Sequence, residues 1–405
     1  MSKIKIKNFG PIKSGCTEND GWIDIKKVTL FIGNQGSGKS TIAKLISTLT
    51  WLEKAMVRGD LRHNEISQYE FIEHCKFQRI NNYFNDKTLI EYESDVLYFK
   101  YTKELRPPKI QLKSNTEFRT GKINYVPAER NYLSSVKNMF GVKNLPESIN
   151  SFAYEYRNAQ LKYSTEVMTL PVGNVKHSYN PSNDVSYIVG DDYKLDLVEA
   201  ASGYQSYIPM YLVTKYLMEE ISIKSENLDV NQQIRKANEK NVILSDATLS
   251  NDQKIALTKK VDEKYVNHYL TNIVEEPELN LFPSSQQKML YSLLEFNNLF
   301  EGNRLIMTTH SPYFINYLTL AVKAFNVKQA LTDSAAIEKV AAIVPIESTV
   351  NPDDLIIYQL NEATGTVTPL ESYKGLPSDE NYLNDSLAES NELFAQLQQI
   401  EKGWQ

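Results

Sequence analysis

Apolar and polar positions follow two periods along this chain, one typical of β-strands and one typical of α-helices. Residues 27–32 form a nearly continuous apolar run, which predicts a strand buried on both faces. A glycine-rich turn follows, and residues 41–52 then have apolar side chains at helical spacing. The same order of buried strand and helix recurs within residues 270–296 and 304–325. Strands that alternate with helices in this way predict an α/β fold with a largely parallel central sheet.

Shorter segments predict elements added to that sheet. Residues 88–92, 96–101 and 109–112 alternate apolar with polar positions and are rich in aromatic side chains, which predicts an antiparallel β region. Further strands are expected at 1–6, 122–126, 341–344 and 355–360, a hairpin at 185–197 and a helix at 201–220.

Two segments predict helices outside the central body. Residues 221–268 are polar and lysine-rich with weak helical periodicity, and Ser250 begins a capping box, so we expect a projecting helical arm. The last predicted helix is amphipathic. Its apolar stripe contains Leu393, Phe394, Leu397 and Ile400.

Composition narrows the class of protein. Hydrophobic residues make up 41% of the chain and charged residues 23%, which is ordinary globular usage. No stretch approaches eighteen consecutive apolar residues, and the first six residues lack the apolar core of a signal peptide. Cys16 and Cys75 lie far apart without metal-ligand spacing. A soluble protein of the reducing cytoplasm is the expected class.

Charge is unevenly distributed along the chain. The net charge is −6, so nothing global favours nucleic-acid binding. Lys100 to Lys143 nevertheless holds ten Lys or Arg against three Asp or Glu, and residues 346–405 hold eleven Asp or Glu against two Lys. Both segments can be solvated faces. The alternatives are contact of the basic segment with phosphate or an acidic partner, and docking of the acidic tail on a basic protein.

The turn after the first buried strand matches the pattern G-x-x-x-x-G-K-[ST]. Its residues are Gly33, Asn34, Gln35, Gly36, Ser37, Gly38, Lys39 and Ser40, with Thr41 following. The glycines allow main-chain N–H groups to point at phosphate oxygens at a helix N-terminus. Lys39 would then face the β- and γ-phosphates, and the Ser40 hydroxyl would bind Mg²⁺. The pattern predicts an ATP site.

Two further strand ends bear polar side chains. Glu275 and Glu276 end a buried strand, at the sheet edge where ligands of open α/β sheets bind. We expect one carboxylate in the shell of the metal and the other polarising the attacking water. His310 ends the next buried strand, where it could contact the γ-phosphate. Ser202 and Gly203 open a helix and offer a hydroxyl and free N–H groups to a phosphate.

In this order, the motifs resemble the Walker A, signature, Walker B and switch-histidine motifs of ABC-type ATPases. They lie at residues 33–41, 202–205, 273–283 and 309–312. The opening Asn-Phe-Gly-Pro-Ile-Lys and the Glu-Glu-Pro-Glu form of Walker B are similar to OLD-family and RecF-like proteins and to the ATPase subunits of the anti-phage systems Septu and PARIS. Residues 125–130 are also similar to a segment of that defence group.

The resemblance implies an ABC-type P-loop NTPase head with an antiparallel β subdomain and a helical arm insertion. Its first part would be 1–210, the arm 211–268, the second part 269–330, and the C-terminal strands and acidic tail 331–405. Such ATPases hold two nucleotides between two heads.

The resemblance also implies a role for each motif. Ser202, Gly203 and Gln205 of one protomer would meet the ATP held by Lys39 of the other. Glu276 would be the catalytic carboxylate and Glu275 the acid on the metal side, although Glu275 replaces the usual Asp. Tyr204 replaces the second signature glycine. The region around Arg130 and Asn131 stands where a Q-loop glutamine is expected.

Three functions fit these motifs. The first is an ATP-hydrolysing homo-oligomer that acts in anti-phage defence and controls a separate effector, such as a nuclease, because no DxD pattern of an intrinsic nuclease follows His310. The second is a RecF-like repair ATPase that clamps DNA through its basic segment. The third is the nucleotide-binding subunit of an ABC transporter, for which the Glu-Glu-Pro-Glu motif, the arm and the acidic tail are unusual.

Overall fold

The computed structural model describes residues 2–113, 119–136, 138–223, 228 and 230–402. Outside the described residues lie 114–118 and 137 of the basic segment, 224–227 and 229 of the predicted arm, and 403–405 of the acidic tail.

A seven-stranded sheet forms the centre of the molecule, in the order β2-β16-β15-β4-β14-β13-β8. The strands are β2 Gly15–Cys16, β16 Thr366–Pro369, β15 Leu355–Asn361, β4 Val28–Gly33, β14 Arg304–Thr309, β13 Tyr269–Glu275 and β8 Gly121–Val126. From β15 to β8 every neighbouring pair is parallel, whereas β15 and β16 pair antiparallel. The predicted α/β fold with a largely parallel central sheet is therefore confirmed.

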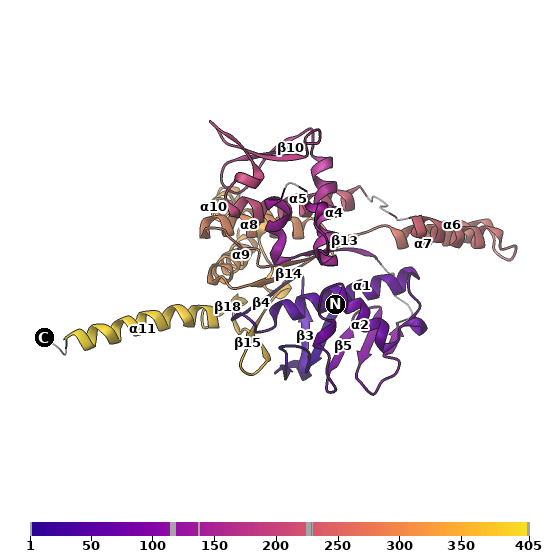
Figure 1. Cartoon of the computed structure of the whole chain (residues 1–405), viewed down its shortest axis with the longest axis horizontal. Coiled ribbons are helices and arrows are strands. Elements are labelled where there is room, and N and C mark those ends of the chain that lie inside the picture. Colours follow the sequence, from indigo (N-terminus) through magenta and orange to yellow (C-terminus); the bar gives the residue numbers. More distant parts are fainter. Residues whose placement is uncertain (1, 114–118, 137, 224–227, 229, 403–405) are drawn as a thin grey trace.

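The N-terminal half contributes a second, antiparallel sheet, in the order β3-β1-β5-β6-β7. Its strands are β1 Ser2–Lys7, β3 Trp22–Ile25, β5 Leu89–Glu93, β6 Leu97–Tyr101 and β7 Lys109–Leu112. Helix α1 Lys39–Arg58 lies between this sheet and the central sheet (Figure 1), and α2 Gln68–Lys76 packs beside α1. The aromatic alternating segments thus form the antiparallel region that their pattern predicts.

The opposite face of the central sheet is covered by helices. They are α3 Tyr132–Ser135, α4 Glu147–Lys162, α5 Ser202–Ser222, α8 Pro283–Asn298 and α9 Pro312–Ala330, and α10 Ser334–Ala341 packs against α9. A small antiparallel sheet, in the order β12-β11-β10-β9, lies beyond them. Its strands are β9 Val167–Thr169, β10 Lys176–Asn180, β11 Val185–Val189 and β12 Lys194–Asp196. The hairpin predicted at 185–197 is the pair β11 and β12.

Alternating side chains of the central strands enter two separate cores. In β4, Leu30 and Ile32 join the core on the side of α5 and α8, while Phe31 joins the core on the side of α1. In β13, Val274 joins the core on the side of α5 and α8, and Ile273 joins the core on the side of α1. This two-sided burial explains the continuous apolar runs of these strands.

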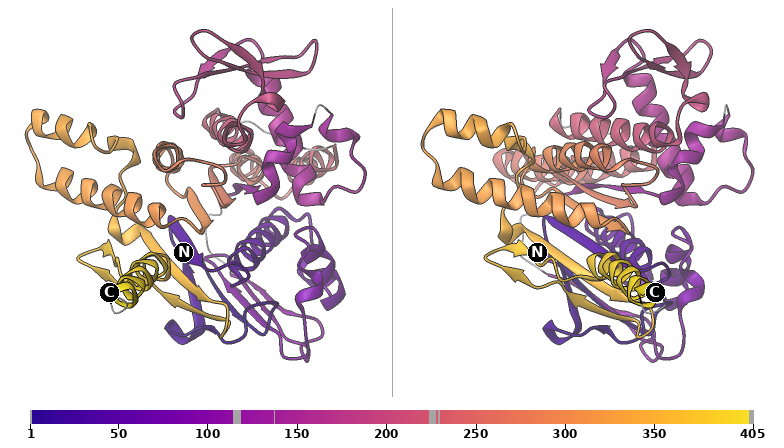
Figure 2. Two further views of the ribbon diagram at one scale, coloured as in Figure 1. Left: turned by 60° about the vertical axis from the view of Figure 1, so that its left-hand side comes forward. Right: turned by 90° about the vertical axis from the view of Figure 1, so that its left-hand side faces the viewer.

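Two helical elements project from the body on opposite sides (Figure 1). Helices α6 Val230–Ser245 and α7 Asn251–Tyr265 form the predicted arm, and the capping box at Ser250 is present. Helix α11 Tyr382–Lys402 extends the other way and is seen almost end-on in Figure 2. The side chains of its apolar stripe are 53–64% exposed.

The predicted strand at 341–344 is wrong. Ala341 ends α10, which is capped by the Asp333 side chain, and a turn follows. Besides β15 and β16, the described part of the C-terminal region contains only the short strands β17 Ser372–Tyr373 and β18 Leu376–Pro377, which pair with each other. β15 pairs with β4, which places residues 355–361 in the same sheet as the glycine-rich loop. The boundaries 1–210, 211–268, 269–330 and 331–405 stay predictions.

Candidate functional site

Three adjacent parallel strands deliver the polar motifs to one edge of the central sheet. β4 leads into the glycine-rich loop, β14 ends next to His310, and β13 ends at Glu275. The register pairs Thr309 of β14 with Ile32 of β4, and Glu275 of β13 with Thr308 of β14. Motifs that are 271 residues apart therefore meet at the carboxyl ends of neighbouring strands.

The loop from Gly33 to Gly38 needs glycine for two reasons. Gly33, Gly36 and Gly38 have φ of 143°, 79° and 103°, a region that favours glycine. A Cβ at Gly33 would also lie 2.4 Å from the carbonyl oxygen of Leu360 on the neighbouring strand. Asn34 at the rim donates its amide to Glu362 at 2.9 Å. Asn34, Gln35 and Gly36 are exposed, so the loop opens toward solvent at the N-terminus of α1.

Lys39 lies at the base of this loop with its side chain buried. Its Nζ donates to the carbonyl oxygens of Gly33 at 2.8 Å and Asn34 at 2.9 Å, and it lies 3.5 Å from His310 Nδ1. Burial lowers the pKa of Lys39 to about 8, and Glu276 is the carboxylate that opposes this shift most. Ser40 is half-buried beside it and Thr41 is buried on α1.

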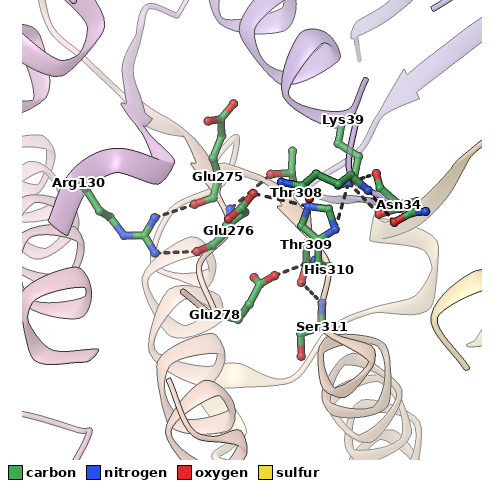
Figure 3. A network of polar contacts seen from close by, with 12 residues as sticks. Asn34, Lys39, Arg130, Glu275, Glu276, Glu278, Thr308, Thr309, His310 and Ser311 are labelled. Atoms are coloured by element: carbon green, nitrogen blue, oxygen red, sulfur yellow. Dashed lines mark hydrogen bonds and ion pairs between the residues drawn. The ribbon is translucent and has the colours of Figure 1, made fainter. Parts of the chain in front are cut away.

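Glu276 and His310 continue the contact chain from Lys39 (Figure 3). His310 Nε2 lies 3.6 Å from Glu276 Oε1, so the imidazole lies between the ammonium and the carboxylate. The hydrogen bond with His310 lowers the pKa of Glu276, which keeps this carboxylate ionised. Glu276 has φ of 44°, uncommon for a residue with a side chain, and its N–H donates to the carbonyl oxygen of Thr308 at 3.0 Å.

Glu275 and Glu278 differ from Glu276 in burial and partners. Glu275 is 3% exposed, and its Oε1 accepts no hydrogen bond within the described chain. Glu278 Oε1 accepts from the His310 N–H at 2.7 Å, which fixes the backbone that positions the imidazole. Burial raises the pKa of Glu278. The positioning role of Glu278 was not predicted, because an acid beside two other acids in the sequence gives no sign of which N–H it accepts.

Arg130 holds the main chain of both adjacent glutamates. Its side chain is fully buried, and the guanidinium donates to the carbonyl oxygens of Glu275 and Glu276 at 2.7 Å each (Figure 3). It also donates to the carbonyl oxygens of Ser206 at 3.0 Å and Pro127 at 3.2 Å. One side chain thus joins the strand bearing the glutamates to the helix that begins at Ser202. The sequence placed Arg130 at the expected Q-loop position but did not show this contact.

The residues of the signature-like motif lie at the start of α5. Ser202 is exposed, and a Cβ on Gly203 would lie 2.8 Å from the carbonyl oxygen of Asn280. Within the chain, the Gln205 amide binds locally, donating to the carbonyl oxygens of Val198 and Ala200 and accepting from the Ser135 hydroxyl. The predicted contact of these residues with a second protomer's nucleotide stays a prediction.

The side chains present at this site fit a nucleotide with magnesium. The Ser37 hydroxyl and Glu275 Oε1 are buried without a hydrogen-bond partner in the described chain. Ser37 belongs to the same loop as Lys39 and Ser40, and Glu275 ends a strand of the same sheet. A hydroxyl and a carboxylate are oxygen ligands that Mg²⁺ accepts, with phosphate and water completing its shell. Among the described residues no cluster of three or more His, Cys, Asp or Glu is suited to hold a metal ion.

A family model described as AAA ATPase domain matches residues 143–315. The match includes the Ser202, Glu275 and His310 motifs but begins after the glycine-rich loop. No curated protein matches the chain. No helix in the described part of the chain is long and apolar enough to cross a membrane.

Solved structures similar to this chain include ATPase heads and cassettes. The SMC head domain from Thermotoga maritima has 11% identity and a TM-score of 0.35, over 92% of this chain and 98% of that one. The ATP-binding cassette MJ0796, as a dimer bound to ADP and Pi, has 12% identity and a TM-score of 0.29, over 92% and 100%. A second dimeric structure of MJ0796, a bacterial ABC transporter cassette, has 11% identity and a TM-score of 0.27, over 92% of this chain and 100% of that one.

The sheet topology and the glycine-rich loop give an α/β fold with a phosphate-binding type of turn, and part of this chain is similar to an AAA ATPase domain. At the edge of that sheet His310 lies between Lys39 and Glu276, and the roles of these residues stay predictions.

Proposed function

We propose that this chain binds ATP with Mg²⁺ and hydrolyses it to ADP and phosphate. The observation that supports this most directly is the contact chain from Lys39 through His310 to Glu276, with distances of 3.5 and 3.6 Å. Lys39 would exchange its carbonyl partners for the β- and γ-phosphates. Main-chain N–H groups at the start of α1 would bind the remaining phosphate oxygens.

Each carboxylate has its own role in this proposal. Glu276 remains ionised and half-exposed, so it orients the attacking water and accepts its proton. Glu275 is buried with a free oxygen, which suits it to hold the metal with Ser40. Bound Mg²⁺ would neutralise charge that develops on the phosphates. His310 would contact the γ-phosphate, and Glu278, which accepts from the His310 N–H, would hold the backbone that follows β14.

We further propose that two chains close on two nucleotides. Ser202 is exposed at the N-terminus of α5, as a residue that serves a second protomer must be. Its hydroxyl and the N–H groups of the first turn would bind the ATP held by Lys39 of the other protomer. The site would then be complete only in the dimer.

The cellular role that we propose is a nucleotide-gated scaffold of anti-phage defence, which controls a separate effector such as a nuclease. The resemblance of the motifs at Asn8–Lys13 and Glu275–Glu278 to that group supports it. So do the two projecting elements, because α11 and the arm α6–α7 expose apolar side chains that a further protein can cover.

The DNA-repair alternative is weakened by the basic segment itself. Lys100, Lys103, Lys113 and Lys122 each pair with a carboxylate of this chain, and Arg130 is buried. Most of the described positive charge between 100 and 143 is therefore engaged within the protein. A shift of duplex DNA at low salt that disappears at high salt would revive the alternative.

The Glu276→Gln variant tests both hydrolysis and dimerisation. It keeps the shape of the side chain but loses the base, so we expect ATP to remain bound while turnover falls by about a hundredfold or more. Light scattering should then show a dimer with MgATP and a monomer without nucleotide. Lys39→Ala is the matched control and should bind no ATP and stay monomeric. Wild-type turnover of Glu276→Gln, or a strict monomer with bound ATP, would refute the corresponding half of the proposal.

A further inference from the structure

A cavity of about 360 Å³ lies along the edge strand of the central sheet, away from the nucleotide site. Its floor is β8, and its walls come from α1 and α2 on one side and α4 on the other. β8 ends the strand order of the sheet, so its outer edge is not covered by a further strand of the described chain. A sheet edge with open space beside it is the requirement for adding a strand.

The backbone of β8 presents free hydrogen-bonding groups to this cavity. The Thr120 carbonyl accepts from His268 on the β13 side, so by alternation Gly121, Ile123 and Tyr125 direct their main-chain groups outward. The contact of Lys54 Nζ with the outward Gly121 carbonyl, at 2.6 Å, agrees with that alternation. For Ile123 and Tyr125 no such partner from another element is found in the described residues.

The buried side chain of Gln78 also indicates that the cavity binds a ligand. Gln78 is 1% exposed and lines the cavity, and its Oε1 has no hydrogen-bond partner in the described chain. Its amide nitrogen donates to the Ser47 hydroxyl at 3.1 Å, which fixes the side chain. A buried acceptor without a donor is destabilising and is satisfied when a ligand donates to it.

The lining of the cavity favours an occupant with both apolar and basic side chains. Trp51 is 44% exposed, and its ring packs against His74, while Phe152 lies on the opposite wall. Three carboxylates and one lysine line the cavity. Lys122 pairs with Glu155 at 2.6 Å and Glu73 pairs with Lys76 at 3.5 Å, so Glu147 is the lining carboxylate that has no ion pair among the described residues. An extended segment that alternates apolar with basic residues matches this surface.

We propose that this β8 groove binds an extended basic segment of a separate protein by strand addition. The segment pairs with the outward N–H and C=O groups of Ile123 and Tyr125. β8 continues into the turn that holds Arg130, and Arg130 holds the carbonyls of Glu275 and Glu276. Occupancy of the groove therefore changes the rate of ATP hydrolysis, a consequence that rests on the function proposed above.

Eight-residue peptides with blocked termini, in which lysine alternates with valine, test binding to the β8 groove. Their affinity for the full chain is measured by calorimetry without nucleotide, beside peptides with glutamate in place of lysine and peptides with a central proline. Strand addition predicts that the lysine peptide binds at least about tenfold more tightly than either. Amide exchange at Ile123 and Tyr125 should slow by about tenfold in its presence.

Two variants locate the binding. Ser151→Trp fills the groove from an exposed position on α4 and should weaken the lysine peptide by at least about tenfold. Gln111→Trp is the matched control, because it places the same side chain on β7, the edge strand of the other large sheet, and should leave the affinity unchanged.

Three results would overturn the proposal. They are equal affinity of the glutamate peptide, unchanged affinity in Ser151→Trp, and binding of free adenosine in the groove with no binding of any peptide, which would make it a small-molecule site. Lys39→Ala should bind the lysine peptide normally. A chain that binds the peptide but hydrolyses no ATP would refute the proposed ATPase and leave strand addition standing.

Discussion

The contacts of Arg130 allow a quantitative prediction, because this one side chain supports both halves of the site. Burial lowers its pKa to about 10, so the guanidinium remains charged at neutral pH. Burial of the charged guanidinium is unfavourable, and the nearby carboxylates of Glu278, Glu276 and Glu275 offset part of this effect. Four carbonyl oxygens accept its hydrogen bonds. Each one that is left without a donor would lower the free energy of unfolding by about 1–3 kcal/mol.

Arg130→Met removes the desolvation penalty but leaves these carbonyls unsatisfied. We therefore expect the free energy of unfolding to fall by about 3–5 kcal/mol. Arg130→Lys keeps the charge, but one ammonium cannot reach carbonyls arranged around a planar fork, so a loss of about 2 kcal/mol is expected. Because the main chain of Glu276 loses its support, kcat should fall by about tenfold in Arg130→Lys. KM for ATP should change by less than about twofold, since Arg130 does not contact the glycine-rich loop.

Urea unfolding and steady-state ATP hydrolysis measure these effects. Arg79→Lys is a suitable control, because Arg79 lies at the surface and pairs with Glu129 at 3.8 Å. It should change stability by less than about 0.5 kcal/mol and leave kcat unchanged. If Arg130→Lys were as stable and as active as wild type, the buried guanidinium would not be what positions the two glutamates.

Three other predictions follow from the same geometry. His310→Ala should lower kcat by at least about tenfold with little change in the Kd for ATP, measured by single-turnover and binding assays, and an equal loss in both would contradict a role in turnover. Burial lowers the pKa of Lys39 to about 8, and loss of the opposing Glu276 carboxylate lowers it further, so the phosphate-binding ammonium form is lost as the pH rises; ATP affinity of Glu276→Gln should therefore fall by at least about tenfold from pH 7 to pH 9, with proton uptake in calorimetry, and a flat profile would contradict it. Gly33→Ala should reduce the free energy of unfolding by more than about 2 kcal/mol in urea, because its Cβ meets the Leu360 carbonyl at 2.4 Å, and a wild-type midpoint would contradict that clash.

The central sheet and the meeting of its motifs were predictable from local patterns. Continuous apolar runs at β4, β13 and β14 indicate strands buried on both faces, and polar residues directly after such strands must gather at one edge. The neighbourhood of Lys39, His310 and Glu276 is a consequence of that rule.

Other parts of the fold depend on contacts between distant segments and could not be predicted. Nothing in the sequence near Arg130 shows that its side chain turns inward to carbonyls 145 residues away. The contacts of the Gln205 amide with carbonyls of the preceding loop depend on how that loop folds, and its expected contact with a second protomer stays a prediction. The apolar run at 341–344 was misleading, because the helix cap at Asp333 decides the local structure there.

The opposed projections of α6–α7 and α11 also affect how the molecule moves through solution. A helix of 21 residues extends about 30 Å, comparable to the diameter of a small domain. Friction on such extensions gives the monomer a Stokes radius well above that of a sphere with the same mass. Elution volume alone would therefore report a single copy as a larger species, and only a shape-independent mass can count the chains in solution.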